Sequence, residues 1–397
     1  MNLLAVADHL ASLEWSSPSL DSKRCLHALD KYSACEACFG VCPSNAIGAG
    51  KPPTLNAAKC EGCLACLATC PAGAFTGDDA VPALLNAAAR SEAQILELVC
   101  GLYIANETGS PEAGVAIRVR GCLAGIGVGA YLALIALGKS MVIVRSDACA
   151  QCRFASLQPR IEAQLDDAKQ LLQAWGYRDA LISSSSGNLQ AMVTRPVWEA
   201  DNPPLSRRDL FRIASRQGQA ALARTLAQEE GGAAHRRLPR ERQRLLKALA
   251  HLPAGREPGD RLTASRGFAR LMVATNCTAC SACVRACPTG ALQFVQEAET
   301  RFRLSFVPQA CIGCEICAHV CAPAALAVDR NPSLSDVFEQ TQPVLLQEGE
   351  LRRCEGCGAH FARYASRSGA QLCSACEFRR NNPFGSRPVP GVRKVRA

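Results

Sequence analysis

Eight cysteines in the last third of the chain repeat one spacing, C-x2-C-x2-C-x3-C, and this pattern limits the possible folds more than any other feature. They are Cys277, Cys280, Cys283, Cys287, Cys311, Cys314, Cys317 and Cys321. Cysteines two or three residues apart are too close for most disulfide bonds among themselves. The first residues, MNLLAVADHLASLEWSS, also lack the basic start and the apolar run of a secretory signal. We therefore predict metal ligands in a reducing cytoplasm rather than a secreted disulfide scaffold.

This spacing resembles that of bacterial dicluster ferredoxins, which implies two 4Fe–4S clusters. Three thiolates on one tight loop cap three irons of a cubane, while the fourth corner faces away from the loop, so the last cysteine of each motif binds the neighbouring cluster. The resemblance implies one ligand set of Cys277, Cys280, Cys283 and Cys321, and a second of Cys311, Cys314, Cys317 and Cys287. Zinc sites also use C-x2-C pairs, but eight cysteines in this order make zinc the weaker interpretation.

A second pair of motifs near the amino terminus repeats the pattern less regularly. The four motif endings read CPSNAI, CPAGAF, CPTGAL and CAPAAL, which indicates a duplicated structural unit. The complete amino-terminal motif contains Cys60, Cys63, Cys66 and Cys70. The incomplete one contains Cys35, Cys38 and Cys42, with Tyr32 where the first ligand is expected. By the same rule, we expect one cluster on Cys60, Cys63, Cys66 and Cys42.

The remaining amino-terminal site has three obvious cysteines, Cys35, Cys38 and Cys70. Three outcomes are open: a 3Fe–4S cluster, a ligand other than cysteine, or recruitment of Cys25, which lies ten residues before Cys35. We favour Cys25, because the site has an unfilled position and a helical turn with a loop would let this thiol reach it.

Residues 81–200 alternate between strand-like and helix-like patterns. Three apolar runs, AQILELVC, GVAIRVRGC and KSMVIVRSDACAQC, end in cysteine and suit buried strands. Strand–helix–strand alternation predicts a parallel sheet, whose ligands collect at the carboxyl ends of the strands. The cysteines at those ends are Cys100, Cys122, Cys149 and Cys152. Four such thiolates are enough for one 2Fe–2S cluster or one zinc ion.

The apolar run Gly121–Gly138 lies between the second and third of these strands. It carries no charge over 18 residues, which barely reaches the length of a membrane span. Because it is rich in glycine and leads directly into a strand, we predict a buried core helix and no transmembrane span.

The segments IRVRGCLAG and VIVRSDACAQC resemble the small iron–sulfur subunit of methyl-viologen-reducing hydrogenases, which joins hydrogenase to heterodisulfide reductase. That family carries a group of cysteines near its first strand, where this chain has Cys100 alone, so the cluster type stays open. Two other interpretations also stay open: a structural domain with incidental thiols, and a redox dithiol formed by Cys149 and Cys152.

Two further C-x2-C pairs lie near the carboxyl terminus, separated by fifteen residues. They are Cys354 with Cys357, and Cys373 with Cys376. This spacing predicts a closed tetrahedral zinc site, with a single rubredoxin-like iron as the alternative. If Cys25 is also a ligand, the predicted sites use all 24 cysteines of the chain.

Positive charge is concentrated between Ser206 and Arg270, where fifteen basic residues face six acidic ones. The excess equals the net charge of +9 for the whole chain. Nucleic-acid binding would be the sharper interpretation, but no nucleic-acid motif accompanies the charge. We therefore predict a solvated, partly helical linker and no nucleic-acid partner, and we rank docking to an acidic protein surface above nucleic-acid binding. The stretch Ser206–Arg208 resembles the opening of the accessory ferredoxins of periplasmic nitrate reductase.

We therefore predict an α+β multidomain protein in which two dicluster ferredoxin-like modules flank an α/β parallel-sheet domain and a zinc-ribbon-like knuckle follows. The expected segments are an amino-terminal extension (1–24), a dicluster module (25–80), the α/β domain (81–200), the basic linker (201–266), a second dicluster module (267–335) and the knuckle with a basic, disordered end (336–397).

The predicted function is the relay of single electrons through 4Fe–4S clusters to or from a partner oxidoreductase, either a molybdenum-dependent enzyme or a hydrogenase-type complex. We expect a carrier or complex subunit rather than a stand-alone catalyst, since no dinucleotide-binding, P-loop or flavin motif is visible. The alternative is an accessory or maturation factor for a molybdenum enzyme such as formate dehydrogenase or nitrate reductase.

Overall fold

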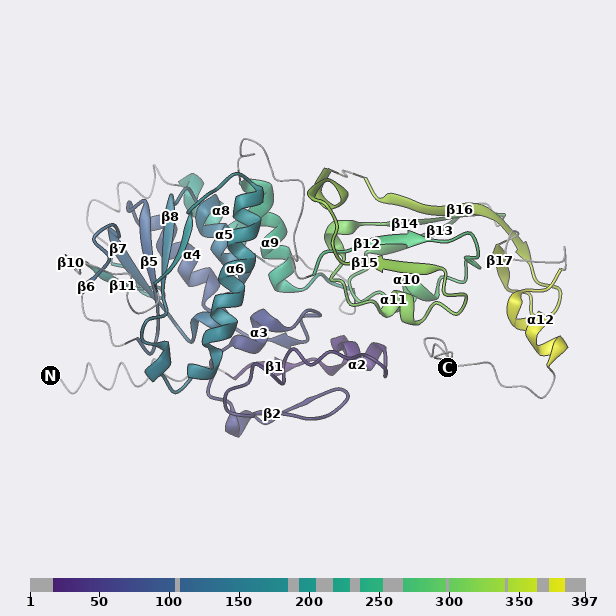
Figure 1. Ribbon diagram of the computed structural model, residues 1–397, viewed down its shortest axis with the longest axis horizontal. Helices are drawn as coiled ribbons and strands as arrows, with labels where there is room; N and C mark the ends of the chain where they lie inside the picture. Colours follow the sequence, from purple (N-terminus) through teal and green to yellow (C-terminus); the bar gives the residue numbers. More distant parts are fainter. Residues whose placement is uncertain are drawn as a thin grey trace. The chain divides into compact units, whose positions relative to one another are not determined.

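The computed structural model describes residues 17–103, 108–184, 193–204, 217–228, 236–252, 267–297, 300–339, 342–362 and 371–382. The chain divides into two compact units, which Figure 1 colours along the sequence. The first unit comprises Met1–Ala28, Ala34–Gly231 and Pro239–Gly259. The second comprises Leu29–Ser33, Gly232–Leu238 and Asp260–Ala397.

A five-stranded parallel sheet forms the centre of the first unit. Its strands, in spatial order, are β11 (Val197–Glu199), β7 (Val115–Val119), β5 (Ile95–Cys100), β8 (Met141–Arg145) and β9 (Leu181–Ser184). Leu98 of β5 lies between Ile117 of β7 and Val144 of β8, and all three are fully buried. The parallel sheet predicted from the apolar runs is therefore present.

Helices connect and cover these strands (Figure 1). They are α4 (Val81–Arg90) before β5, α5 (Val128–Ala136) between β7 and β8, and α6 (Gln158–Ala174) between β8 and β9. A short pair, β6 (Thr108–Gly109) with β10 (Val193–Thr194), lies beside the sheet. Helix α5 is the predicted core helix, and most of its residues are buried. Among the described residues, no helix is both long and apolar enough to cross a bilayer.

Two helices from the basic segment belong to the first unit. Helix α8 (Gln217–Ala227) packs on α4, and α9 (Arg240–His251) packs on α5. The carboxylate of Asp79, ahead of α4, accepts hydrogen bonds from Arg240 at 2.8 Å and from Arg244 at 2.8 and 3.1 Å. Because Asp79 and Arg244 are both buried, these bonds fix α9 to the rest of the unit.

The amino-terminal cysteine motifs lie on a small module within the first unit. Its strands are β1 (Ser19–Leu20), β2 (Ile47–Gly48), β3 (Thr54–Leu55) and β4 (Phe75–Thr76), and its helices are α2 (Leu26–Leu29) and α3 (Ala65–Thr69). Strand β1 pairs with β4, and β2 with β3, both antiparallel. Ile47, Leu64 and Phe75 form its core together with the cysteines.

The second unit repeats this arrangement with longer strands. Its elements are β12 (Arg270–Val273), α10 (Ala282–Ala286), β13 (Leu292–Glu297), β14 (Arg301–Phe306), α11 (Ile316–His319) and β15 (Leu326–Asp329). Strand β12 pairs with β15, and β13 pairs with β14, both antiparallel. Both modules therefore have one topology, in which a cysteine motif lies in each connection between the outer and inner strands.

A tail module, formed by β16 (Val344–Arg353), β17 (His360–Ala362) and α12 (Ser374–Asn381), extends the second unit. Strand β16 pairs with β14 and β17 pairs with β16, which makes a four-stranded sheet in the order β13-β14-β16-β17. A π-helical turn (Ser335–Glu339) precedes β16. The tail is thus joined to the ferredoxin-like module by backbone hydrogen bonds.

Candidate metal centres

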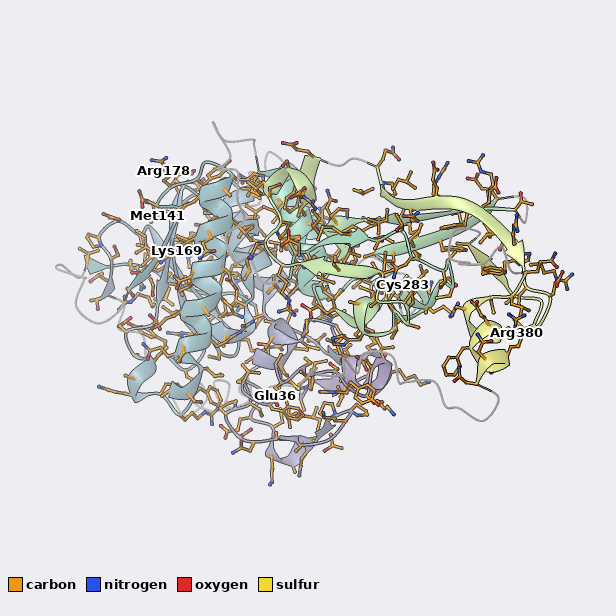
Figure 2. The ribbon with its side chains drawn as sticks, turned by 45° about the vertical axis from the view of Figure 1, so that its right-hand side comes forward. Glu36, Met141, Lys169, Arg178, Cys283 and Arg380 are labelled. Carbon is orange, nitrogen blue, oxygen red and sulfur yellow. The ribbon has the colours of Figure 1, made fainter. Side chains whose placement is uncertain are left out.

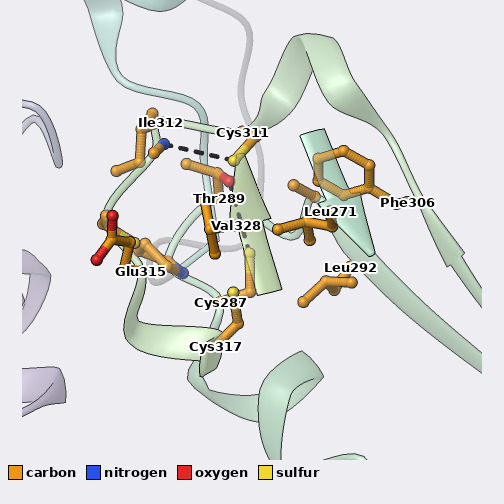
Figure 3. Close-up of a pocket in the computed structure, with 14 residues that line it drawn as sticks. Leu271, Cys287, Thr289, Leu292, Phe306, Cys311, Ile312, Glu315, Cys317 and Val328 are labelled. Carbon is orange, nitrogen blue, oxygen red and sulfur yellow. Dashed lines mark hydrogen bonds between the residues drawn. The ribbon is translucent and has the colours of Figure 1, made fainter. Parts of the chain in front are cut away.

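Two cavities in the second unit are each lined by four thiols. One contains Cys287, Cys311, Cys314 and Cys317, and the other contains Cys277, Cys280, Cys283 and Cys321. Figure 3 shows the first cavity, in which Cys311 lies on one side of Thr289 and Cys287 and Cys317 lie on the other. Each cavity takes three thiols from one motif and the last thiol from the other, and these are the two sets that the spacing predicted.

The loops that carry these thiols share an unusual backbone. In the two motifs, the residues on either side of the second cysteine have positive φ: Ala279 (55°) and Ser281 (53°), then Gly313 (63°) and Glu315 (61°). Left-handed residues at these places turn successive backbone N–H groups toward the inside of the loop, as in anion-binding nests. Backbone N–H groups also donate to the sulfurs, from Gly313 to Cys311 at 3.4 Å and from Ala325 to Cys321 at 3.2 Å.

The electrostatics of these thiols favour a bound cation. Burial raises the pKa of Cys283 to about 12, and the charge of Cys280 adds to the rise. Burial likewise raises the pKa of Cys314 to about 12, with Cys311 and Cys287 contributing. Thiolates packed this closely are stable only beside a compensating positive charge, which iron supplies. With four sulfur donors and inward N–H groups in each cavity, the residues present fit a 4Fe–4S cluster.

In the amino-terminal module, a group of four thiols also surrounds the complete motif. Burial raises the pKa of Cys63 to about 11, and the charges of Cys42 and Cys60 raise it further. Cys66 is also near Cys63, Cys60 and Cys42, which add to the raised pKa that burial gives it. The flanking residues Gly62 and Leu64 have φ of 64° and 63°, as in the second unit. Cys42, from the incomplete motif, thus joins the three thiols of the complete one.

Cys38, from the incomplete motif, lies near three other thiols. Burial raises the pKa of Cys38 to about 12, and the nearby charges of Cys70, Cys35 and Cys25 raise it further. The residues flanking Cys38 do not share the positive φ seen beside Cys63, Cys280 and Cys314. This loop therefore differs in backbone as well as in the absence of its first cysteine. The structure brings Cys25, rather than the 51% exposed Tyr32, to this group.

Cys25 also has the local structure of a first motif cysteine. Cys25, Cys60 and Cys311 each follow a single 3-10 turn, formed by Ser22–Arg24, Ala57–Lys59 and Pro308–Ala310. Each has an extended backbone and donates its N–H at 3.1 Å to the carbonyl three residues earlier. Cys25 follows β1 as Cys60 follows β3 and Cys311 follows β14. The backbone around Cys25 therefore matches that of the first cysteine in two complete motifs.

The four cysteines of the α/β domain meet at the carboxyl edge of the parallel sheet. Burial raises the pKa of Cys149 to about 12, and the charges of Cys100 and Cys152 add to the rise. Cys122 is buried, and Cys100 and Cys149 are near enough to raise its pKa further. The N–H of Phe154 donates to the sulfur of Cys152 at 3.4 Å. The four thiols are therefore neighbours, which is the arrangement a single cofactor requires.

The glycines of GCLAGIGVG have packing roles. A Cβ on Gly125 would lie 3.0 Å from the Cβ of Leu64, in the loop between Cys63 and Cys66. A Cβ on Gly129 would lie 2.7 Å from the backbone nitrogen of Leu245, and one on Gly127 would collide with Glu241. These glycines let the amino-terminal module and α9 approach the domain closely. Sequence reasoning noted the glycines but missed this role, which only the fold makes visible.

The four tail thiols form the tightest group. The sulfurs of Cys354, Cys357, Cys373 and Cys376 all lie within 4.8 Å of one another. Cys357 and Cys373 are 3.7 Å apart, close to the edge of about 3.8 Å of a tetrahedron with zinc–sulfur bonds of about 2.3 Å. The N–H of Cys373 donates to the sulfur of Cys354 at 3.2 Å and, with other backbone N–H groups, lowers the pKa of Cys354 to about 6. The geometry fits one tetrahedral metal ion rather than a cubane.

Two regions that the sequence singled out lie outside the described residues. The stretch Ser206–Arg208 falls within the gap between residues 204 and 217, and the basic end falls after residue 382.

Comparison with protein-family models matches residues 276–325 to the 4Fe-4S dicluster domain. The matched segment contains all eight thiols of the two cavities in the second unit. No curated protein and no solved structure matches the chain. Together with the cysteine groups, the match supports an iron–sulfur protein of the ferredoxin type that binds 4Fe–4S clusters and has an electron-transfer role.

Proposed function

We propose that this chain relays single electrons through a series of iron–sulfur clusters to or from a partner oxidoreductase. The observation that carries the proposal is the pair of cavities in the second unit, each lined by three thiols of one motif and the last thiol of the other. When bound, 4Fe–4S clusters supply one-electron chemistry. The protein's own residues hold them, exclude water and direct N–H groups at the sulfurs, which tunes the reduction potential.

A second dicluster site in the amino-terminal module follows from the shared topology. In this proposal Cys60, Cys63, Cys66 and Cys42 hold one cluster. Cys25, Cys35, Cys38 and Cys70 hold the other. The 3-10 turn before Cys25 and its closeness to Cys38 support Cys25 over a 3Fe–4S cluster or a ligand other than cysteine.

The α/β domain adds a further site in the same proposal. Cys100, Cys122, Cys149 and Cys152 would hold a 2Fe–2S cluster, for which four thiolates are enough. The support is their meeting at the carboxyl edge of a parallel sheet, where such folds bind ligands. In the tail, Cys354, Cys357, Cys373 and Cys376 would hold zinc, because the sulfur spacing suits a single tetrahedral ion.

The proposed partner is a molybdenum-dependent oxidoreductase or a hydrogenase-type complex, and this part rests on the sequence resemblances alone. The function itself is tested by redox titration of the anaerobically purified chain, followed by electron paramagnetic resonance. We expect signals from reduced 4Fe–4S clusters that appear and disappear in one-electron steps. Clusters that cannot be reduced and reoxidised reversibly would exclude a relay.

A further inference from the structure

The tail module touches the loop between Cys277 and Cys280. The N–H of Ala362, the last residue of β17, donates to the carbonyl of Thr278 at 3.3 Å. The side chain of Ala279 packs with Phe302, Leu351 and Ala362 in one buried cluster. Thr278 and Ala279 are the two residues between Cys277 and Cys280, so the tail rests directly on the loop that carries three thiols of one cavity.

The loop position that receives the tail differs from its counterparts. Gly62 and Gly313 occupy the same place in the other complete motifs, with φ of 64° and 63°. Ala279 adopts a φ of 55° despite its Cβ, which is unfavourable for any residue except glycine. Ala279 shares a buried apolar cluster with the tail residues Leu351 and Ala362, and it is only 8% exposed. The tail thus packs on a loop position whose backbone conformation is unfavourable for alanine.

The loop that carries Cys311, Cys314 and Cys317 contacts a different part of the chain. At Gly313, the nearest atoms to an added Cβ belong to Gly267 and Phe268, which lead into β12. None of these nearest atoms belongs to the tail. Any effect of the tail is therefore expected on the cavity of Cys277, Cys280, Cys283 and Cys321, and not on the cavity of Cys287, Cys311, Cys314 and Cys317.

In the described residues after β16, the tail has little regular structure besides a short strand and an exposed helix. Strand β17 has three residues, and the eight-residue helix α12 has no buried residue. Cys354 directly follows β16, Cys357 lies between the two strands, and Cys373 and Cys376 lie at the start of α12. A metal ion on these thiols would tie the β16–β17 turn to the helix, and small units of this kind fold with their metal.

We propose that the tail is a metal-dependent clamp on the Cys277–Cys283 loop, so that metal bound by the tail thiols keeps the cluster of that loop from being released. This inference rests on the proposed function, since it takes the cavities to hold 4Fe–4S clusters and the tail to hold one metal ion. It adds a role for the tail metal that needs no electron to pass through it.

The test compares cluster release from the full-length wild-type protein and from Cys376→Ser, prepared without oxygen. Metal analysis first shows whether the tail ion is lost, and circular dichroism shows whether the protein is folded. An iron chelator is then added, and native mass spectrometry counts the clusters that remain with time. We expect one cluster to leave at least fivefold faster in Cys376→Ser and the others to leave at wild-type rates.

Two backgrounds identify the cluster that is released. In a Cys280→Ala background the fast phase should be absent, because the affected cluster is already missing. In a Cys314→Ala background it should persist. Leu351→Ala keeps all four tail thiols but removes an apolar contact to Ala279, so it should retain the tail metal and still speed release. Arg380→Ala, an exposed change on α12 (Figure 2), is the matched control and should behave as wild type.

Wild-type release rates for every cluster in a folded Cys376→Ser protein that has lost its tail ion would overturn the clamp. A fast phase that survives in the Cys280→Ala background would overturn it as well. Failure of the proposed function would look different, because the clusters of the wild-type protein would then be absent or would not be reduced and reoxidised reversibly.

Discussion

The backbone N–H of Cys122 donates to the carbonyl oxygen of Cys63 at 3.4 Å. One residue belongs to the thiol group of the parallel sheet and the other to the complete motif of the amino-terminal module. The charge of the Cys63 thiol contributes to the raised pKa of Cys122, so the two candidate sites are neighbours within the first unit. Electrons would have a short path between them if both sites hold clusters.

This contact depends on the absence of a side chain at Gly125. We predict that Gly125→Val pushes the Leu64 loop away from the sheet, since an added Cβ would lie 3.0 Å from Leu64 and 3.2 Å from the carbonyl oxygen of Cys63. Crowding of this kind costs about 1–3 kcal/mol. The melting temperature of Gly125→Val, measured by thermal unfolding, should therefore be lower than that of the wild type. Gly40→Ala, in the same module but with open space around the added carbon, is the control and should unfold like wild type.

Cys25 should be needed for one amino-terminal cluster. We predict that Cys25→Ala either converts that cluster to a 3Fe–4S form or loses it, so that the iron content falls by about one to four atoms per chain. Electron paramagnetic resonance would distinguish the two. Tyr32→Phe should leave every signal unchanged, because Tyr32 is exposed. An unaltered spectrum for Cys25→Ala, or a lost cluster in Tyr32→Phe, would assign the fourth ligand elsewhere.

Glu241 should make the stability of the first unit depend on pH. Burial raises the pKa of Glu241 to about 7; the Asp79 carboxylate adds to the rise, while Arg244 and the N–H of Gly129 oppose it. A carboxyl with a raised pKa stabilises the fold below its unfolded value of about 4.3. That stability is lost as the pH rises through 7.

Glu241→Gln removes this dependence. We therefore predict that the melting temperature of the variant, relative to wild type, increases between pH 4.5 and pH 7.5. Over this range, the difference in the free energy of unfolding between variant and wild type should change by at most about 3 kcal/mol, since each pKa unit is worth about 1.4 kcal/mol. A difference that stays constant over this range would show that Glu241 titrates normally in the folded protein.

The attachment of α9 should depend on Asp79. Burial acts to raise the pKa of Asp79, but Arg244 and Arg240 outweigh it and hold the pKa below its usual value. Asp79→Ala would leave the buried Arg244 without this carboxylate, and breaking a buried pair costs about 3–5 kcal/mol. Hydrogen exchange of the α9 amides should accelerate accordingly. Asp166→Asn, which alters an exposed pair with Lys169 at 4.0 Å, should change exchange little.

The features that could be predicted from sequence are those that a regular spacing encodes. The apolar runs before Cys100 and Cys122 indicated the parallel sheet, because buried parallel strands are apolar on both faces. Ligand spacing indicated the two thiol sets of the second unit, because a cubane imposes its geometry on the loop. The role of Cys25 as a ligand stays a prediction that rests on an unfilled position, and the turn before it carries no recognisable signal in the sequence.

Other features depend on partners that are distant in the chain. The segment containing α9 has the composition of a solvated linker, yet Arg244 is buried because Asp79 accepts its hydrogen bonds. The pairing of β16 with β14 was likewise not predicted, since VLLQEGELRR lacks a clear apolar alternation. That pairing places the tail on Ala279, so the clamp could not be inferred from the sequence.

The central claim is that the motif thiols hold iron–sulfur clusters, and the most direct test is iron and sulfide analysis of the full chain purified without oxygen. The account predicts about 16 irons in four cubanes, with about two more if the sheet site holds a 2Fe–2S cluster. It also predicts about one zinc per chain in the tail. A colourless protein whose motif cysteines carry zinc or form disulfides would contradict it.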